Sequence, residues 1–265
     1  MPKDHLDRFD LDAAPLTVAG ATLIVQDLDR LVRFYRDALG LTVIKQTDDA
    51  VTLGAGTPFL TLVGNRDARR ANPREPGLFH IAFLLPDRQS LSSWLSHVLA
   101  TGVTPIGASD HNVSEAIYLE DPEGNGIEVY VDRPVAGWAG PDGRVFMPSR
   151  RLDLAALPDP TDWLGAPDQT RIGHVHLKSP DLVRSEQFWI EQGFDVTARY
   201  PGGSFFGAGG YHHQLAANVW HGTGHAVPEG PVTGLSELAL TTSGTPRHPA
   251  IAPSGVRVTY NPKGV

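Results

Sequence analysis

An internal repeat constrains this sequence more than any other feature. Residues 21–43 and 175–196 each contain an apolar strand, an Asp-Leu pair, an amphipathic helix with two adjacent aromatic residues, and a glycine before a new strand. Asp27 and Asp181 lie where a side-chain oxygen can accept a backbone N–H bond at the start of each helix. Glycine suits the left-handed position that ends a helix. The repeat therefore predicts a recurring unit of strand, helix and further strands.

Two further copies of the unit are weaker. One begins at Gly77 and contains a helical pattern over 88–102 and a run of turn-forming residues at 121–126. The other begins at Gly234, but residues 244–255 contain three prolines and cannot form its helix. The pattern predicts an α+β fold of four βαβββ modules, the last one abridged, paired into two domains whose curved mixed β-sheets form clefts.

A segment rich in Pro and Gly follows the second module and indicates a linker. We expect residues 1–135 to form an N-terminal domain of two modules, 136–170 a linker, and 171–265 a C-terminal domain whose second module is truncated. We also expect consecutive modules to share a sheet, so that the units beginning at Leu16 and Gly77 pair.

Composition narrows the possible functions. The chain has no cysteine, so disulfides, thiolate nucleophiles and zinc–thiolate sites are excluded, and a metal would need ligands from the eleven histidines and the carboxylates. The net charge of −8 argues against a nucleic-acid partner, because phosphate binding needs a basic surface. No apolar run is long enough to span a membrane, and the polar N-terminus has no signal core. We therefore expect a cytoplasmic protein.

Several short motifs add a family resemblance. They are residues 121–128 (DPEGNGIE), 111–114 (HNVS), 132–134 (DRP), 173–177 (GHVHL) and 210–213 (GYHH). With the modules, they make nearly the whole chain resemble the vicinal-oxygen-chelate superfamily of glyoxalases, bleomycin-resistance proteins and extradiol dioxygenases, and within it the two-domain catechol 2,3-dioxygenase-like proteins. The resemblance implies a metal held by two His and one Glu, on the first strand of one module and the first and last strands of the next. Such a triad leaves three positions for a bidentate substrate and O₂.

The resemblance implies that His80 and Glu128 are metal ligands in a first cleft. His80 lies seven residues before an aspartate, and His174 occupies the same place in its own module. Glu128 alternates with apolar neighbours and therefore faces the opposite side of its strand. The equivalent position of the first module is Gly20, so His5 or a residue elsewhere would have to supply the third ligand.

The second half of the chain offers an alternative cleft. There the resemblance implies a ligand set of His174, Glu237 and one of the pair His212 and His213. The position equivalent to the carboxylate of the first cleft is Arg257, and a guanidinium group cannot ligate a metal. We therefore favour the first cleft.

Four further residues are expected at the site. In extradiol enzymes a His and a Tyr placed like His111 and Tyr118 stand over the metal, which implies proton transfer by the histidine and a hydrogen bond from the tyrosine to a substrate oxygen. His176 shares a strand face with the histidine two residues before it. We expect His176 and Ser114 to contact the substrate.

The function that the resemblance implies is an Fe(II)-dependent, extradiol ring-cleaving dioxygenase that acts on a catechol-like aromatic small molecule and O₂. The alternatives are a non-redox metalloenzyme of the glyoxalase type and a metal-free protein that binds a small molecule, as in antibiotic resistance. Fe(II) is the metal we expect, while Mn, Zn, Ni and Co accept the same ligands. Neither nucleic acid nor a membrane is expected as a partner, and the resemblance leaves room for a homodimer.

Overall fold

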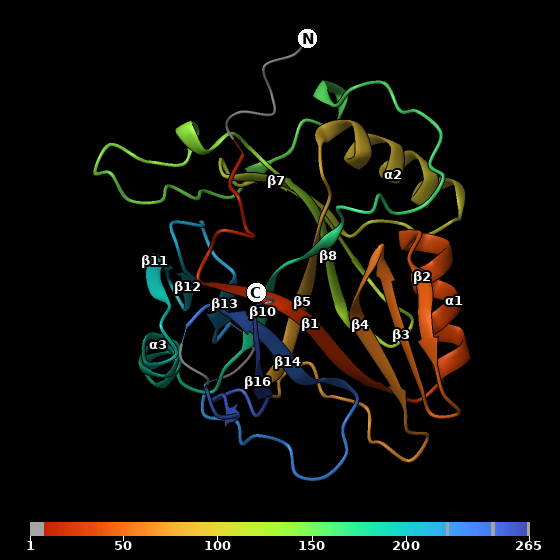
Figure 1. The fold of residues 1–265 in the computed structure, drawn as a ribbon, viewed down its shortest axis with the longest axis vertical. Helices are drawn as coiled ribbons and strands as arrows, with labels where there is room; N and C mark the ends of the chain where they lie inside the picture. The colour runs from red at the N-terminus through yellow and green to blue at the C-terminus, as the bar shows by residue number, and fades with distance from the viewer. Residues whose placement is uncertain (1–7, 221–222, 245–246, 264–265) are drawn as a thin grey trace.

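The computed structural model describes residues 8–220, 223–244 and 247–263, which form two curled sheets with α-helices on the periphery (Figure 1). The first module contains β1 (Leu16–Val25), α1 (Leu28–Leu39), β2 (Thr42–Gln46), β3 (Ala50–Ala55) and β4 (Thr57–Gly64). The second contains β5 (Gly77–Leu84), α2 (Arg88–Ala100), β6 (Gly107–Asp110), β7 (Ser114–Glu120) and β8 (Gly126–Asp132). The third contains β10 (Arg171–Lys178), α3 (Leu182–Glu191), β11 (Asp195–Tyr200), β12 (Gly203–Gly207) and β13 (Leu215–Asn218). The fourth contains β14 (Gly234–Thr242), β15 (Ala250–Ile251) and β16 (Arg257–Pro262).

The helix ends agree with the sequence pattern. The side chain of Asp27 accepts a hydrogen bond from the backbone N–H of Arg30, and Asp181 accepts one from Arg184 in the same way. Gly40 ends α1 with a φ angle of 71°, in the left-handed region. The described part of the fourth module contains no helix. Among the described residues, no helix has the length and apolar character needed to cross a membrane.

The modules pair in an order that the sequence did not predict. One sheet has the strand order β15-β16-β14-β1-β4-β3-β2 and joins the first module to the fourth. The other has the order β11-β12-β13-β10-β5-β8-β7-β6-β9 and joins the second module to the third. The units that begin at Leu16 and Gly77 therefore lie in different sheets, and the expected pairing of first with second and third with fourth is wrong. The α+β class with curved mixed sheets is confirmed, since each sheet combines parallel and antiparallel neighbours.

The connection between the second and third modules is packed against the fold. It contains β9 (Arg150–Arg151), which extends the nine-stranded sheet, and two 3-10 turns, at Val135–Gly137 and Leu154–Ala156. Further along, Ser92 of α2 donates a hydrogen bond to the carbonyl of Pro158 (2.5 Å). The domain boundaries at residues 135 and 171 stay a prediction. Each of the two sheets contains strands that precede this connection in the chain and strands that follow it.

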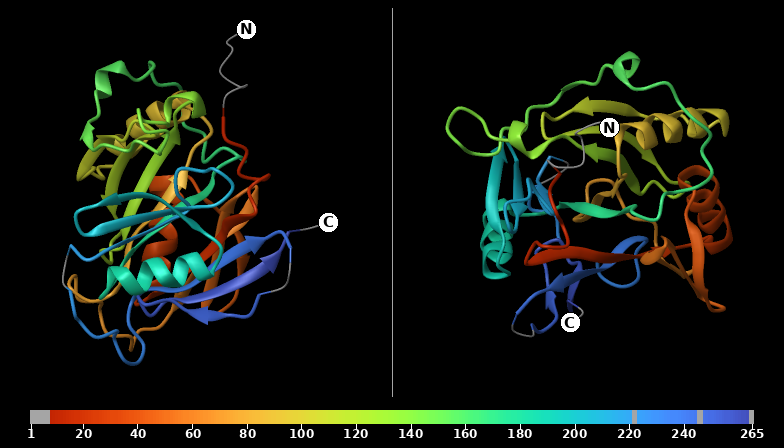
Figure 2. Two further views of the ribbon diagram at one scale, coloured as in Figure 1. Left: turned by 90° about the vertical axis from the view of Figure 1, so that its left-hand side faces the viewer. Right: turned by 45° about the horizontal axis from the view of Figure 1, so that its top comes forward.

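The two sheets share one apolar core and are also tied by polar contacts. The carboxylate of Glu123, in the turn before β8, accepts the backbone N–H groups of Gln26 (2.9 Å) and Asp27 (2.8 Å) from the first module. The buried hydroxyl of Tyr35 on α1 donates to Asp121 in the same turn (3.1 Å). The second module is therefore anchored to the first by its turn, although their strands do not pair. The right-hand view of Figure 2 shows α3 and α1 on opposite flanks of the molecule.

Candidate active site

A single row of cross-strand neighbours carries the candidate site. In the nine-stranded sheet, His174 on β10 is the register partner of Ala82 on β5, Ala82 is the partner of Glu128 on β8, and Glu128 is the partner of Tyr118 on β7. Side chains of register partners project from the same face of a sheet. His80 lies two residues before Ala82 and shares that face. Because Ala82 has only a methyl group, the longer side chains of His174 and Glu128 can meet above it.

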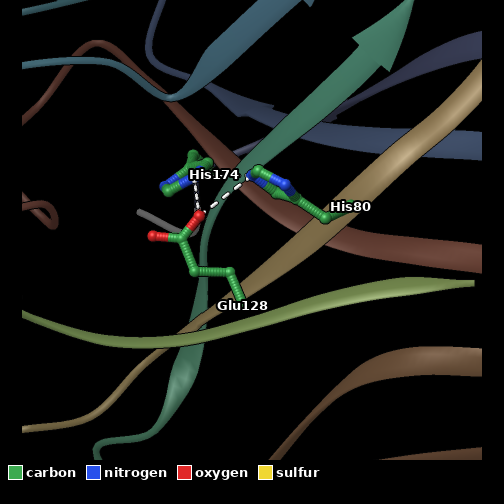
Figure 3. Close-up of side chains that lie close together, drawn as sticks. All are labelled: His80, Glu128 and His174. Atoms are coloured by element: carbon green, nitrogen blue, oxygen red, sulfur yellow. Dashed lines mark hydrogen bonds and ion pairs between the residues drawn. The ribbon is translucent and has the colours of Figure 1, made fainter. Parts of the chain in front are cut away.

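His80, Glu128 and His174 converge on one point (Figure 3). The Nε2 atoms of His80 and His174 lie 3.0 Å and 3.2 Å from Oε2 of Glu128, and 3.3 Å from each other. Neighbouring ligands on one face of an octahedron lie about 3 Å apart when metal–ligand bonds are about 2.0–2.2 Å long. The three donor atoms therefore have the spacing of a facial His₂Glu triad. The expected convergence of His80 with Glu128 is observed, and the third donor comes from the third module.

Burial and charge hold the triad in a state that suits metal binding. Burial by itself would raise the pKa of Glu128, but the charges and hydrogen bonds of His174 and His80 outweigh it and hold that pKa well below 4.5. Desolvation lowers the pKa of His174 below its ordinary 6.5, against the opposing effect of Glu128. At neutral pH the site thus offers an ionised carboxylate and an unprotonated His174, the forms that ligate metals.

His111 and Tyr118 form a hydrogen-bonded pair beside the triad. Nδ1 of His111 lies 3.0 Å from the carbonyl oxygen of Pro148, and Nε2 lies 2.8 Å from the hydroxyl of Tyr118. A carbonyl oxygen only accepts hydrogen bonds, so Nδ1 carries a proton, and in the neutral ring Nε2 accepts the tyrosine O–H. Burial and then the charge of Glu128 raise the pKa of Tyr118 well above 10, so its hydroxyl stays protonated.

An open cavity of about 510 Å³ lies over the triad. It is lined by four residues expected in the first cleft, His80, Glu128, His111 and Tyr118, and also by His176 and Ser114. The buried ring of His176 accepts a hydrogen bond at Nε2 from the side-chain amide of Asn218 (2.9 Å). Met147 and Ser149 of the inter-module connection line the cavity too. Sequence analysis missed these two because a Pro- and Gly-rich segment has no periodicity that assigns its residues to a site.

The alternative ligand set is not assembled. Glu237 lies on β14 of the other sheet, where it forms an ion pair with Arg257 (3.4 Å). His213 lines the cavity, and its ring centroid lies 4.2 Å from that of His174. His212 lies behind it and does not line the cavity.

A polar chain runs from His213 away from the cavity. Nε2 of His212 donates to the carboxylate of Asp132 (2.8 Å), because a carboxylate can only accept. With both rings neutral, Nδ1 of His212 then accepts from Nδ1 of His213 (2.8 Å). Desolvation by burial holds the pKa of His213 well below 6.5. In that tautomeric arrangement, Nε2 is the unprotonated nitrogen of His213.

The missing ligand at Gly20 is explained by the module pairing. Gly20 lies on β1, in the sheet that does not contain the triad, and its register partner is Ala239 on β14. His5 lies outside the described residues. The signal that could have identified the third donor was in the sequence, since His174 occupies the same place in its module as His80. The prediction was wrong in the choice of the partner module.

The fold and the His–His–Glu cluster define a class of protein, and comparison agrees. The chain belongs to the glyoxalase/bleomycin resistance protein/dioxygenase superfamily, whose family model matches residues 17–129.

The most informative relative is a protein of Bacillus subtilis (strain 168) named catechol-2,3-dioxygenase, which is 38% identical over 212 residues, covering 76% of this chain and 74% of the relative. Among solved structures, a putative dioxygenase from Bacillus subtilis superposes with a TM-score of 0.63 at 13% identity, covering 93% of this chain and 84% of that one. Glyoxalase I from Zea mays superposes with a TM-score of 0.55 at 15% identity, covering 93% of this chain and 92% of that one. The two structural matches establish likeness of fold alone.

Proposed function

We propose that the protein is a metal-dependent ring-cleaving dioxygenase of the extradiol kind, which acts on a catechol-like aromatic small molecule and O₂. The observation that carries the proposal is the buried cluster of His80, Glu128 and His174 next to the His111–Tyr118 pair in one cavity. The identity of 38% to a protein named catechol-2,3-dioxygenase supports the same activity.

The donor set fits a divalent cation. Two imidazole nitrogens and one carboxylate oxygen suit Fe(II), which we propose as the resident metal, and they also suit Mn, Zn, Ni and Co. The donor atoms are buried and lie within 4.8 Å of one another, close enough to bind one ion together. When bound by the triad, such an ion would act as a Lewis acid that lowers the pKa of two adjacent substrate hydroxyl groups, and it would leave room for O₂.

His111 and Tyr118 are proposed to handle the substrate's protons. Nε2 of His111 already accepts a hydrogen bond from Tyr118, so it is the basic nitrogen that can take a proton from a substrate hydroxyl. The hydroxyl of Tyr118 stays protonated and can donate to a substrate oxygen instead. The bond from Nδ1 to the carbonyl of Pro148 holds the imidazole ring in place during this exchange. The neutral ring of His213 offers a second proton acceptor on the cavity wall.

The test is chemical and has three possible outcomes. Protein purified without oxygen is analysed for metal, loaded with Fe(II), and supplied with catechols and ¹⁸O₂. We expect one ion per chain, one O₂ consumed per catechol, and a ring-opened product that contains both labelled oxygen atoms. Metal-dependent conversion of a substrate without O₂ consumption would point to the glyoxalase type. Tight binding of a small molecule by protein that holds no metal would point to a binding protein.

A further inference from the structure

We propose that the substrate is an uncharged catechol that carries a bulky apolar substituent. This inference rests on the proposed function, and it adds the chemical class of the group attached to the ring. It follows from the described walls of the cavity beyond the triad, which contain neither Lys nor Arg and include a row of aromatic side chains that leads to an exposed tryptophan.

Apart from the proposed metal, the described lining of the cavity contains no cationic side chain that could bind an acidic substituent. Its described lining contains two carboxylates, Glu120 and Glu128, and neither Lys nor Arg. Nε2 of His176 already accepts a hydrogen bond from the side-chain amide of Asn218 (2.9 Å), and Nδ1 of His213 lies 2.8 Å from Nδ1 of His212. Both ring nitrogens of His111 are already hydrogen-bonded. A carboxylate on the substrate would therefore be desolvated without a counter-ion, which is strongly unfavourable.

An aromatic wall leads from the triad to the opening. The ring of His176 lies 5.0 Å from that of His80 and 5.4 Å from that of Trp220, measured between centroids. Phe205 lies 5.8 Å from His176 on the same side, and Phe79 packs edge-on against Trp220 at 5.6 Å. Apolar and aromatic groups gain most from contact with such surfaces.

The outer end of this wall exposes large apolar side chains to solvent. Trp220 is 48% exposed and Ile106 is 68% exposed, although both line the cavity. The indole N–H of Trp220 donates to the carbonyl of Pro201 (2.9 Å), so the ring is held in place at the mouth. The cavity of about 510 Å³ is within the range of about 300–1,000 Å³ that larger organic ligands fill, and a bare catechol is much smaller. An apolar substituent would occupy the remaining volume and cover these side chains.

The test separates charge from shape with a matched pair of compounds. The Fe(II)-loaded enzyme is assayed by O₂ uptake with 3-(3,4-dihydroxyphenyl)propanoic acid and with its methyl ester, which differ mainly in charge. We expect kcat/KM for the ester to exceed that for the acid by on the order of 100-fold, the effect of one unpaired buried charge. Catechols with a phenyl group at position 3 or 4 should exceed bare catechol by about 10-fold or more, since each buried methylene contributes roughly three- to fourfold. Equal or faster turnover of the acid overturns the inference and leaves the proposed function intact.

A binding measurement decides the inference even when no catechol is turned over. In that case the proposed function fails, and calorimetric titration of the Zn(II)-loaded protein with the ester and the acid still reports which charge the cavity accepts.

A gain of function completes the test. The substitution Ile106→Arg places a cation at the mouth and should reduce the ester-to-acid ratio at least about tenfold. Ile251→Arg is the matched control, because Ile251 is 63% exposed on β15 and lies outside the cavity lining. A ratio that neither substitution changes, with the acid bound as well as the ester, contradicts the inference.

Discussion

The Nε2 atoms of His80 and His174 lie 3.3 Å apart, although 94 residues separate the two histidines in the chain. They lie on β5 and β10, the first strands of the second and third modules, which pair antiparallel. The candidate metal centre is therefore shared between the halves of the chain rather than repeated in each half.

Removal of either histidine should abolish metal binding. His80→Ala and His174→Ala each remove one of three donors, so we expect the affinity for Fe(II) or Zn(II) to fall by more than about 100-fold, beyond the roughly 10- to 100-fold typical of residues that only support a ligand. Metal content after dialysis and calorimetric titration measure the effect. Glu237→Gln is the control, because Glu237 lies in the other sheet, and it should retain the ion. Loss of the metal in only one of the histidine variants would contradict a shared centre.

Ala82 should be as important to metal binding as a ligand, although it offers no donor atom. It lies in register between His174 and Glu128, whose side chains meet above its methyl group. Ala82→Leu fills that space, so we expect loss of the metal together with destabilisation of about 1–3 kcal/mol from overpacking. Ala82→Gly leaves the space open and should keep the metal. Titration with Zn(II) and thermal unfolding distinguish the two effects, and unaltered affinity in the leucine variant would show that the space is not required.

Loss of the Tyr118 hydroxyl should slow the reaction without releasing the metal. Tyr118→Phe removes the group that hydrogen-bonds His111 (2.8 Å), and proton transfer by a positioned side chain typically contributes about 10²–10⁴-fold to kcat. Oxygen uptake and metal analysis of the same sample measure both quantities. Tyr260→Phe is the control, because the Tyr260 hydroxyl bonds Gln192 (2.6 Å) away from the cavity. If both variants keep full activity, the assignment of Tyr118 is wrong.

The buried histidines should make the metal-free protein less stable in mild acid. Burial holds the pKa of His176 well below its ordinary 6.5, so below pH 6.5 the unfolded chain binds a proton that the folded chain does not. The free energy of unfolding then falls as the pH falls, by up to about 1.4 kcal/mol per pH unit for each such histidine. In urea titrations between pH 7 and 5, His176→Gln should reduce this slope by up to about 1.4 kcal/mol per pH unit. His225→Gln removes a histidine from an exposed position and serves as the control. Parallel curves for wild type and His176→Gln would refute the prediction.

The contact between α1 and the turn before β8 should stabilise the assembly of the two sheets. Tyr35→Phe removes a buried hydrogen bond to the carboxylate of Asp121, and bonds to charged groups contribute about 1.5–3 kcal/mol. We expect the free energy of unfolding to fall by this amount in chemical denaturation. Tyr200→Phe is the matched control, since the Tyr200 hydroxyl has no hydrogen-bond partner among the described residues, and it should change stability by less than about 0.5 kcal/mol. Equal stability of Tyr35→Phe and wild type would count against this anchor.

Local features of the fold were predictable because short stretches of sequence determine them. The caps Asp27 and Asp181, the lack of a helix in the fourth module and the position of Glu128 on the strand face opposite to its apolar neighbours all follow from hydrogen-bonding groups and periodicity within a few residues. The equivalence of His80 and His174 was also visible, because both precede an aspartate by seven residues. The sequence by itself therefore determined the modules and the position of each candidate ligand within its module.

Only the tertiary structure decided which modules meet. All four first strands have the same period and similar apolar faces, so the local pattern does not distinguish a partner on β14 from one on β5. The module pairing depends on long-range contacts. Examples are the register of β5 with β10 and the hydrogen bonds that Glu123 accepts from the backbone of the first module. Because of this pairing, His174 lies beside His80, whereas Gly20 and Glu237 lie in the other sheet, away from the site. The sequence identified the candidate donor residues, but the pairing of strands in the sheet decides which of them meet, because cross-strand neighbours can be far apart in the chain.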